Sequence, residues 1–328
     1  MQSDINMKLS VKKKIILPFL YIFAVTLSII VLNGCNDHKK AAMRNTGEKI
    51  TVITTIFASY DFVRQITGGR VNVALLLPPG SESHSYEPPP KDIIAIQNCD
   101  VFIFIGGETD KWVNRILDSL NTEKIKILAM LETVSAVPEE ITEGMEKDDD
   151  DDTAYDEHVW TSPGNAKTIV RAITELLCKT DPGNAGFYRQ NEFVYLEALA
   201  ELDSVFKDIV AGAKRKTIVF GDRFPFRYFA DAYKLQYFAA FPGCSAETEP
   251  SAATVAFLIN KIKSEQIPVV FHTELSNERM AETISRETGA RKLPLHSCHS
   301  VIKRDFEAGI SYLDLMYRNA ENLREALY

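Results

Sequence analysis

The chain is 328 residues long, with 45% hydrophobic and 25% charged residues, which are ordinary values for a soluble globular body. It carries 37 basic and 45 acidic side chains, a net charge of −8 at pH 7. This balance argues against nucleic acid and anionic membrane surfaces as partners, and it makes a cation a more natural ligand.

The N-terminus predicts a segment for export. Basic residues precede an apolar run over residues 15–32, and Cys35 comes shortly after it, an order that resembles the signal of bacterial lipoproteins. We therefore expect residues 1–34 to be removed and Cys35 to carry a lipid. Residues 35–47 would then tether the body to the extracytoplasmic face of the bacterial cell membrane by the lipid alone. An uncleaved anchor helix is the alternative, although the run is short of the roughly 20 residues that span a bilayer and contains Pro18.

From residue 48 onward the sequence alternates between strands and helices. Expected strands cover residues 51–56, 71–77, 101–105 and 125–130, and expected helices cover residues 58–67, 92–98 and 111–120. Strands separated by helices at this spacing predict an α/β fold with a mainly parallel sheet flanked by helices. Ligands of such sheets bind in the loops beyond the carboxyl ends of the strands.

Two histidines stand in loops of this first half. The loop over residues 78–92 follows the second strand, is stiffened by five prolines and contains His84. The acidic loop over residues 146–157 includes the run Asp148–Asp152, which repels itself and should be solvated, and it ends beside His158. Histidine is a common metal ligand. A solvated histidine in each loop is the alternative interpretation.

A long amphipathic pattern over residues 187–213 predicts one helix of about 40 Å. It lies within a connector over residues 184–213, between an N-terminal lobe over residues 48–183 and a C-terminal lobe over residues 214–328. The second lobe repeats the alternation, with expected strands at residues 217–220, 236–240, 269–271 and 292–295. The loops at the ends of these strands hold the candidate residues Asp222, Glu247, Glu274, His296, Cys298 and His299.

Taken together, these features resemble the metal-specific solute-binding lipoproteins of ABC importers, the zinc/manganese class. The matching pieces lie at residues 79–92, 156–167, 246–255, 269–290 and 309–327, in order and at suitable spacing. The resemblance implies two α/β lobes, each a mainly parallel sheet flanked by helices, joined by one long connector helix.

The resemblance also implies a metal site shared by the two lobes. The family's first two ligands are histidines at the places of His84 and His158. The third ligand, His or Glu, follows the first strand of the second lobe, where Asp222 is the nearest liganding residue, offset by about one position. The fourth is commonly an aspartate before the last helix, where His299 fits best by spacing. The rivals for these last two places are Glu247, His296 and Cys298.

Three imidazoles and a carboxylate suit Zn²⁺, and Mn²⁺ is the alternative cargo because that harder ion prefers more carboxylates. An exported zinc hydrolase is a second alternative. The sequence, however, contains no HExxH, GxSxG or paired-carboxylate motif for a catalytic zinc, and we expect no enzymatic activity. A binding protein for an organic solute would use arginine and aromatic side chains at the strand ends, whereas we expect Arg223 and its aromatic neighbours to pack the lobe interface.

The implied mechanism is capture and delivery of the cation. The acidic loop raises the local cation concentration, one ion binds between the lobes, and the protein, expected to be a monomer, passes it to a membrane permease with its ATPase. A continuous connector helix favours a small rocking motion of the lobes over a wide hinge closure.

Overall fold

The computed structural model describes residues 48–81, 86–107, 110–145, 155–244 and 250–328, and the part from Lys49 to Tyr328 forms one compact unit. Several sequence predictions lie outside the described residues: Cys35, His84, the run Asp148–Asp152 and Glu247. Among the helices of the described part, none combines the length and the apolar character needed to cross a bilayer.

The N-terminal lobe is built on a four-stranded sheet in the order β2-β1-β3-β4, and all of its neighbouring strands run parallel. The strands are β1 (Thr51–Thr54), β2 (Asn72–Leu75), β3 (Val101–Phe104) and β4 (Lys126–Ala129). Val52 of β1 pairs with Val73 of β2 on one side and with Val101 of β3 on the other. The four expected strands are confirmed, each shorter than its apolar run.

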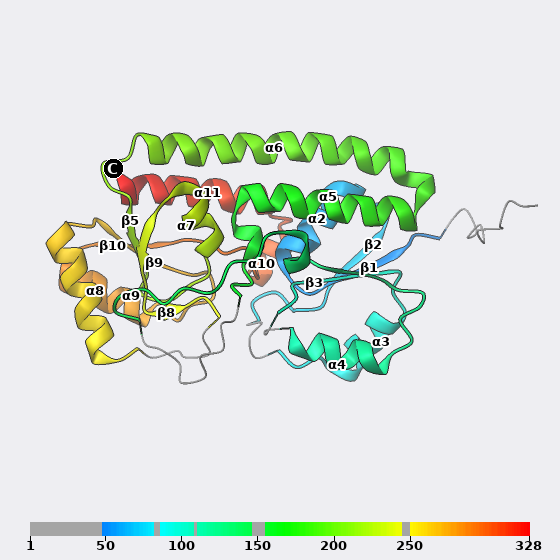
Figure 1. Ribbon diagram of the computed structural model, residues 1–328, viewed down its shortest axis with the longest axis horizontal. Helices are drawn as coiled ribbons and strands as arrows, with labels where there is room; N and C mark the ends of the chain where they lie inside the picture. Colours follow the sequence, from blue (N-terminus) through cyan, green and yellow to red (C-terminus); the bar gives the residue numbers. More distant parts are fainter. Residues whose placement is uncertain (1–47, 82–85, 108–109, 146–154, 245–249) are drawn as a thin grey trace, which may run out of the picture. The chain divides into compact units, whose positions relative to one another are not determined.

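Helices cover this sheet on both faces (Figure 1). They are α2 (Phe57–Thr67), α3 (Pro90–Gln97), α4 (Lys111–Ser119) and α5 (Pro163–Thr180), with short 3₁₀ turns η1 (Leu131–Thr133), η2 (Val159–Thr161) and η3 (Pro182–Asn184). Helix α2 ends at Gly68, whose φ of 54° lies in the left-handed region. A Cβ at Gly68 would also lie 2.9 Å from the Phe187 ring, so both conformation and space require glycine here.

The connector helix α6 (Ala185–Ala211) is unbroken over 27 residues, close to the expected 187–213. Its length is about 40 Å at 1.5 Å per residue. It packs on α2 and α5 of the first lobe and on α7 and α11 of the second (Figure 1). The buried face of the helix comprises Tyr188, Tyr195, Leu199, Leu202, Phe206, Ile209 and Val210. One helix therefore supplies core side chains to both lobes.

The C-terminal lobe consists of short parallel strands with helices around them. Its elements are β5 (Thr217–Val219), β6 (Arg223–Phe224), α7 (Arg227–Tyr233), β7 (Gln236–Phe238), β8 (Phe241–Pro242), α8 (Ala252–Glu265), β9 (Val269–His272), α9 (Arg279–Thr288), β10 (Arg291–Pro294), α10 (Lys303–Glu307) and α11 (Tyr312–Leu327). The pairs β5–β7 and β9–β10 are joined by a parallel bridge between Phe220 and Phe271. The expected two-lobed α/β fold is confirmed, and the small β6–β8 pair is an addition that the sequence did not predict.

Hydrogen bonds of buried groups tie the two lobes together. The backbone N–H of Tyr312 donates to Asp61 Oδ2 at 2.7 Å, and the Tyr312 hydroxyl donates to the Trp160 carbonyl at 2.7 Å. The indole Nε1 of Trp160 in turn donates to the Ser297 carbonyl at 2.7 Å. Because Asp61, Trp160 and Tyr312 have no exposed surface, separating the lobes would leave these polar groups unsatisfied.

The packing of the connector helix can be tested at Phe206, which is fully buried with its ring centroid 4.8 Å from that of Phe229 and 5.4 Å from that of Tyr233. We expect Phe206→Ala to lower the free energy of unfolding by about 3–5 kcal/mol in a urea titration, because it opens a cavity. The matched control is Phe193→Ala on the same helix, where the side chain is 63% exposed and the change should stay within about 0.5 kcal/mol. Equal effects of the two substitutions would contradict this packing.

Candidate metal centre

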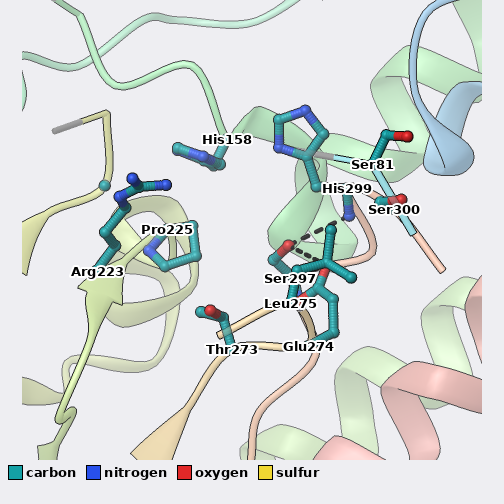
Figure 2. Close-up of a pocket in the computed structure, with 11 residues that line it drawn as sticks. Ser81, His158, Arg223, Pro225, Thr273, Glu274, Leu275, Ser297, His299 and Ser300 are labelled. Atoms are coloured by element: carbon teal, nitrogen blue, oxygen red, sulfur yellow. Dashed lines mark hydrogen bonds between the residues drawn. The ribbon is translucent and has the colours of Figure 1, made fainter. Parts of the chain in front are cut away.

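A small cavity lies where loops of the two lobes meet (Figure 2). Its volume is about 50 Å³ and its lining is polar, comprising Ser81, His158, Arg223, Pro225, Gly243, Thr273, Glu274, Leu275, Ser297, His299 and Ser300. Pockets for organic ligands usually measure about 300–1,000 Å³, so this cavity matches an ion or a water better than an organic solute. The two histidines come from different lobes.

His158 enters the cavity from the N-terminal lobe, directly before η2, and only 2% of the residue is exposed. Its backbone N–H donates to Asp156 Oδ1 at 2.8 Å, and the same oxygen lies 3.2 Å from His158 Nδ1. A neutral ring that donates its Nδ1 proton to Asp156 has its lone pair on Nε2, the nitrogen that could ligate a metal. A carboxylate behind a ligating histidine is the usual means of fixing its tautomer and orientation.

The charge around His158 is strongly negative. Burial acts to lower the pKa of this imidazole, but Asp156, Glu157 and Glu139 act in the opposite direction, and the net effect raises the pKa above its ordinary value. Burial also raises the pKa of Glu139. The surroundings therefore favour positive charge at the ring, whether that charge is a proton or a metal ion.

His299 enters from the loop between β10 and α10. The centroids of the His158 and His299 rings lie 5.9 Å apart, at an angle of 70°. With zinc–nitrogen bonds of about 2.0–2.1 Å, two rings that share one ion have centroids about 5–6.5 Å apart, so the observed distance suits a shared ion. Trp160 packs against both rings. Its ring centroid lies 5.5 Å from that of His158 and 5.1 Å from that of His299.

The backbone of His299 is held by the N-terminal lobe. Helix α2 begins after Ile56, which provides no side-chain cap. Instead, the N–H groups of Phe57 and Ala58 donate to the carbonyls of His299 and Cys298, at 2.9 and 3.1 Å. The first turn of α2 thus depends on a loop of the other lobe, and this loop places His299 in the cavity.

Glu274, one of the candidate residues at the strand ends, also lines the cavity, although no ligand role was predicted for it. It follows β9, and its two carboxylate oxygens accept hydrogen bonds from the hydroxyl and the backbone N–H of Ser297, at 2.7 and 2.8 Å. This fixes the loop that carries His299. Its position at a strand end in the second lobe was the one signal in the sequence that pointed to it.

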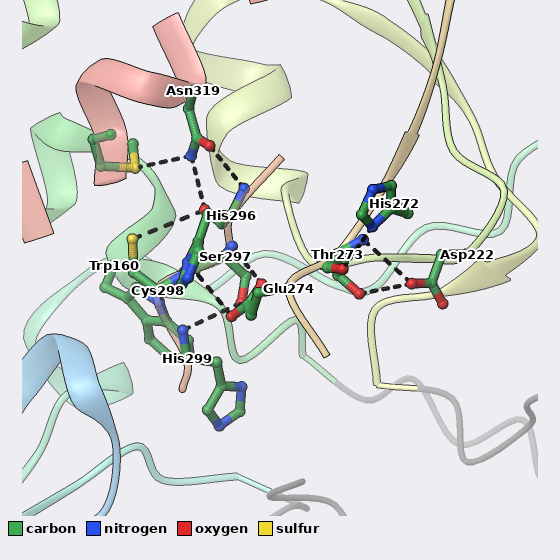
Figure 3. Close-up of polar contacts among 11 residues, drawn as sticks. Trp160, Asp222, His272, Thr273, Glu274, His296, Ser297, Cys298, His299 and Asn319 are labelled. Atoms are coloured by element: carbon green, nitrogen blue, oxygen red, sulfur yellow. Dashed lines mark hydrogen bonds and ion pairs between the residues drawn. The ribbon is translucent and has the colours of Figure 1, made fainter. Parts of the chain in front are cut away.

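Asp222, expected as the third ligand, does not line this cavity. Its Oδ2 accepts hydrogen bonds from the hydroxyl and the N–H of Thr273, at 2.6 and 3.3 Å (Figure 3), and it lines a neighbouring cavity of about 180 Å³. Arg223, the next residue, lines both this neighbouring cavity and the histidine cavity.

The rivals of His299 face elsewhere. His296 Nδ1 accepts a hydrogen bond from the Cys298 N–H at 2.9 Å, and Asn319 bonds to both backbone polar groups of His296 (Figure 3). Cys298 is fully buried, and neither rival lines the cavity. No group of three or more His, Cys, Asp or Glu suited to a metal occurs within the described residues, and His84, the remaining predicted ligand, lies outside them.

Gly243 packs directly on the imidazole of His158. A Cβ at this position would lie 3.2 Å from both Nδ1 and Cε1 of the ring, and 2.9 Å from the Phe224 carbonyl oxygen. A side chain here would therefore force the backbone at Phe224 to shift and would also crowd the His158 ring. Glycine directly after β8 therefore lets the chain pass close to the His158 ring.

Comparison with known proteins places this geometry in context. A family model described as zinc-uptake complex component A, periplasmic, matches residues 52–326. The zinc-binding lipoprotein AdcA of Streptococcus pneumoniae R6 is 30% identical over 307 residues, which cover 92% of this chain and 59% of that protein. The chain thus spans less than two thirds of AdcA. The high-affinity zinc uptake system protein ZnuA of Bacillus subtilis 168 is 29% identical over 315 residues, covering 93% of this chain and 97% of that protein.

Solved structures agree with this result. The Zn(II)-bound ZnuA-like domain of S. pneumoniae AdcA superposes with a TM-score of 0.72 at 30% identity, covering 85% of this chain and 99% of that one. The metal-dependent lipoprotein YcdH of B. subtilis superposes with a TM-score of 0.73 at 29% identity, with the same coverage of 85% and 99%.

The electrostatics of His158 can be tested by NMR titration of the histidine rings. We expect a His158 pKa above the ordinary value of about 6.5 and a His296 pKa below it, because burial lowers the latter more than Glu274 raises it. The Asp156→Asn substitution should move the His158 pKa downward. A raised folded-state pKa stabilises the fold fully below the unfolded value and less as the pH rises through the folded value, so Asp156→Asn should lose stability mainly on the acid side. An unchanged His158 pKa in the variant would contradict the pairing.

Proposed function

Because the chain belongs to the family of periplasmic zinc-uptake complex component A, we propose that it is the extracytoplasmic substrate-binding component of a zinc ABC transporter. Its cargo is one Zn²⁺ ion, captured between the lobes and delivered to a membrane permease. The observation that carries the proposal is the pair of buried imidazoles of His158 and His299, one from each lobe, with ring centroids 5.9 Å apart at an ion-sized cavity.

The proposed ligands are His84, His158 and His299, with Asp222 as the fourth member of the predicted set. Support for His84 comes from Ser81, which lines the cavity and stands three positions before it. Asp222 has the weakest geometric support, because its carboxylate bonds to Thr273 in the neighbouring cavity. Three imidazole nitrogens favour zinc over manganese, which prefers carboxylate oxygens.

Delivery requires only a small motion of the lobes in this proposal. The connector helix and the buried hydrogen bonds across the interface oppose a wide opening, and a shift of the loop that carries His299 is enough to break a site shared by the two lobes. We propose that the protein acts as a monomer with a permease and its ATPase. The acidic run Asp148–Asp152 would attract cations to the site.

We propose that the chain is a transport protein and has no enzymatic activity. A catalytic zinc keeps an open coordination position for a substrate and usually has a general base beside it. The cavity of about 50 Å³ leaves little room for an organic substrate next to an ion. In addition, the Asp156 carboxylate accepts a hydrogen bond from the His158 N–H and lies beside its ring, so we do not assign it the role of a general base.

Zinc binding should stabilise the folded chain, because the ion joins residues that are far apart in the unfolded state. At a thousandfold excess over its dissociation constant, zinc should raise the free energy of unfolding by about 4 kcal/mol. Thermal unfolding with and without zinc measures this shift. His84→Ala, His158→Ala and His299→Ala should each remove most of it.

The controls are two histidines that do not line the cavity, changed by His272→Ala and His296→Ala, both of which should keep the zinc-dependent shift. Asp222→Asn decides whether the fourth predicted ligand takes part. If zinc stabilises the His158 and His299 variants as strongly as the parent, the proposed site is wrong.

We further propose that Cys35 carries the lipid that holds the protein at the outer face of the cell membrane, after removal of residues 1–34. This proposal is based on the order of basic, apolar and small residues before Cys35. Cys35→Ala should release the protein from the membrane fraction, or leave an unprocessed precursor, as shown by cell fractionation and N-terminal mass analysis. A membrane-bound variant with the parent's processed N-terminus would contradict lipid attachment at Cys35.

A further inference from the structure

Ser297 bonds to the segments that carry both histidines of the candidate metal centre. It stands two positions before His299, in the loop between β10 and α10, and it lines the cavity with only 4% of the residue exposed (Figure 2). Its backbone N–H, its hydroxyl and its carbonyl all take part in hydrogen bonds. A serine held in this way can fix the position of the groups on either side of it.

The carbonyl of Ser297 joins it to the segment of His158. It accepts the indole Nε1 proton of Trp160 at 2.7 Å, and Trp160 stands two positions after His158 in η2. This turn is closed by Thr161, whose N–H and hydroxyl both donate to the His158 carbonyl, at 3.1 and 2.8 Å. The bond from Trp160 to Ser297 therefore reaches from the segment of one histidine to the loop of the other.

The hydroxyl of Ser297 joins it to His299. Its oxygen accepts the His299 N–H at 3.2 Å, and its proton is donated to Glu274 Oε1 at 2.7 Å (Figure 3). A hydroxyl has one proton and two lone pairs, so donation to Glu274 leaves a lone pair to face the His299 N–H. Glu274 Oε2 accepts the backbone N–H of Ser297 at 2.8 Å. Glu274 thus orients the serine at both of its donors.

We propose that Ser297, oriented by Glu274, is the positioning residue that sets the spacing of the two metal-binding histidines. This inference rests on the proposed zinc-binding function. Neither residue ligates the ion: Glu274 acts through Ser297, and Ser297 acts through its bonds to Trp160 and His299. Groups that bind a metal must be held to within about 0.5 Å of the productive geometry, and partners behind the ligands are typically worth about 10–100-fold in metal affinity.

The coupling can be tested in the zinc-free protein by NMR. The chain has two tryptophans, Trp112 and Trp160, and each gives one indole N–H signal. Ser297→Ala and Glu274→Gln should each shift the Trp160 signal and speed its exchange with solvent, because the loop that provides the accepting carbonyl is released. Trp112 lies in α4 and is the internal reference, whose signal should not change. A Trp160 signal that stays like the parent's in both variants overturns the coupling.

Zinc affinity then tests the consequence for the site. It is measured on the whole chain against a fluorescent zinc indicator, and each substitution should weaken binding about 10–100-fold. Glutamine offers one acceptor oxygen in place of two, which is enough for the backbone N–H once the Ser297 hydroxyl is absent. The double variant should therefore bind no more weakly than Ser297→Ala alone. If the two factors multiply instead, Glu274 acts on the ion directly, and its role through Ser297 is overturned.

Two matched controls do not line the cavity. Ser285→Ala removes a hydroxyl that donates to the Ala290 carbonyl at 2.7 Å in the same lobe, and Glu192→Gln changes a carboxylate on α6 whose side chain is 14% exposed. Both should bind zinc like the parent, and circular dichroism confirms that each variant is folded.

The outcomes separate the two proposals. A parent that binds no zinc overturns the proposed function, while the tryptophan signals still decide the coupling. If Ser297→Ala and Glu274→Gln bind zinc as tightly as the parent, the positioning role is overturned and the zinc-binding function stays intact.

Discussion

The arrangement of the candidate site depends on the way in which helix α2 is capped. The first N–H groups of a helix need acceptors, and Ile56 has no side chain that can serve. The carbonyls of Cys298 and His299 accept them from across the lobe interface. To do so the loop turns through Cys298 with a φ of 61°, in the left-handed region, a conformation that most residues avoid. One set of backbone bonds thus stabilises a helix of the first lobe and places a histidine of the second.

Hydrogen bonds of the segment that precedes His158 also hold the two lobes together. The Tyr228 hydroxyl donates to the Asp156 carbonyl at 2.7 Å, and the Cys244 N–H donates to the Glu139 carboxylate at 2.7 Å. Both histidines are therefore carried by segments that bond to the opposite lobe. A wide opening would break these bonds together with the α2 cap, whereas a small displacement of one loop would break fewer of them.

Charged side chains of both lobes lie around the cavity. Carboxylates surround His158 from the side of the N-terminal lobe, where they raise its pKa. The C-terminal lobe presents Arg223 to the same cavity. A cation is thus favoured beside His158.

The sequence by itself determined the features that depend on local periodicity and spacing. These are the alternating strands and helices, the single long helix between two lobes, and the strand-end loops from which His158 and His299 reach the cavity. It could not determine which side chains of a loop share a cavity, because that depends on backbone direction and on hydrogen bonds to residues far along the chain. Asp222 and Arg223 are adjacent in sequence, but Arg223 lines the histidine cavity and Asp222 does not, because the Asp222 carboxylate is hydrogen-bonded to Thr273. Likewise His296 is turned away by its bonds to Cys298 and Asn319, whereas the carbonyl of His299 is bonded to α2. Only tertiary structure decides such choices, since the groups that make them are brought together by folding.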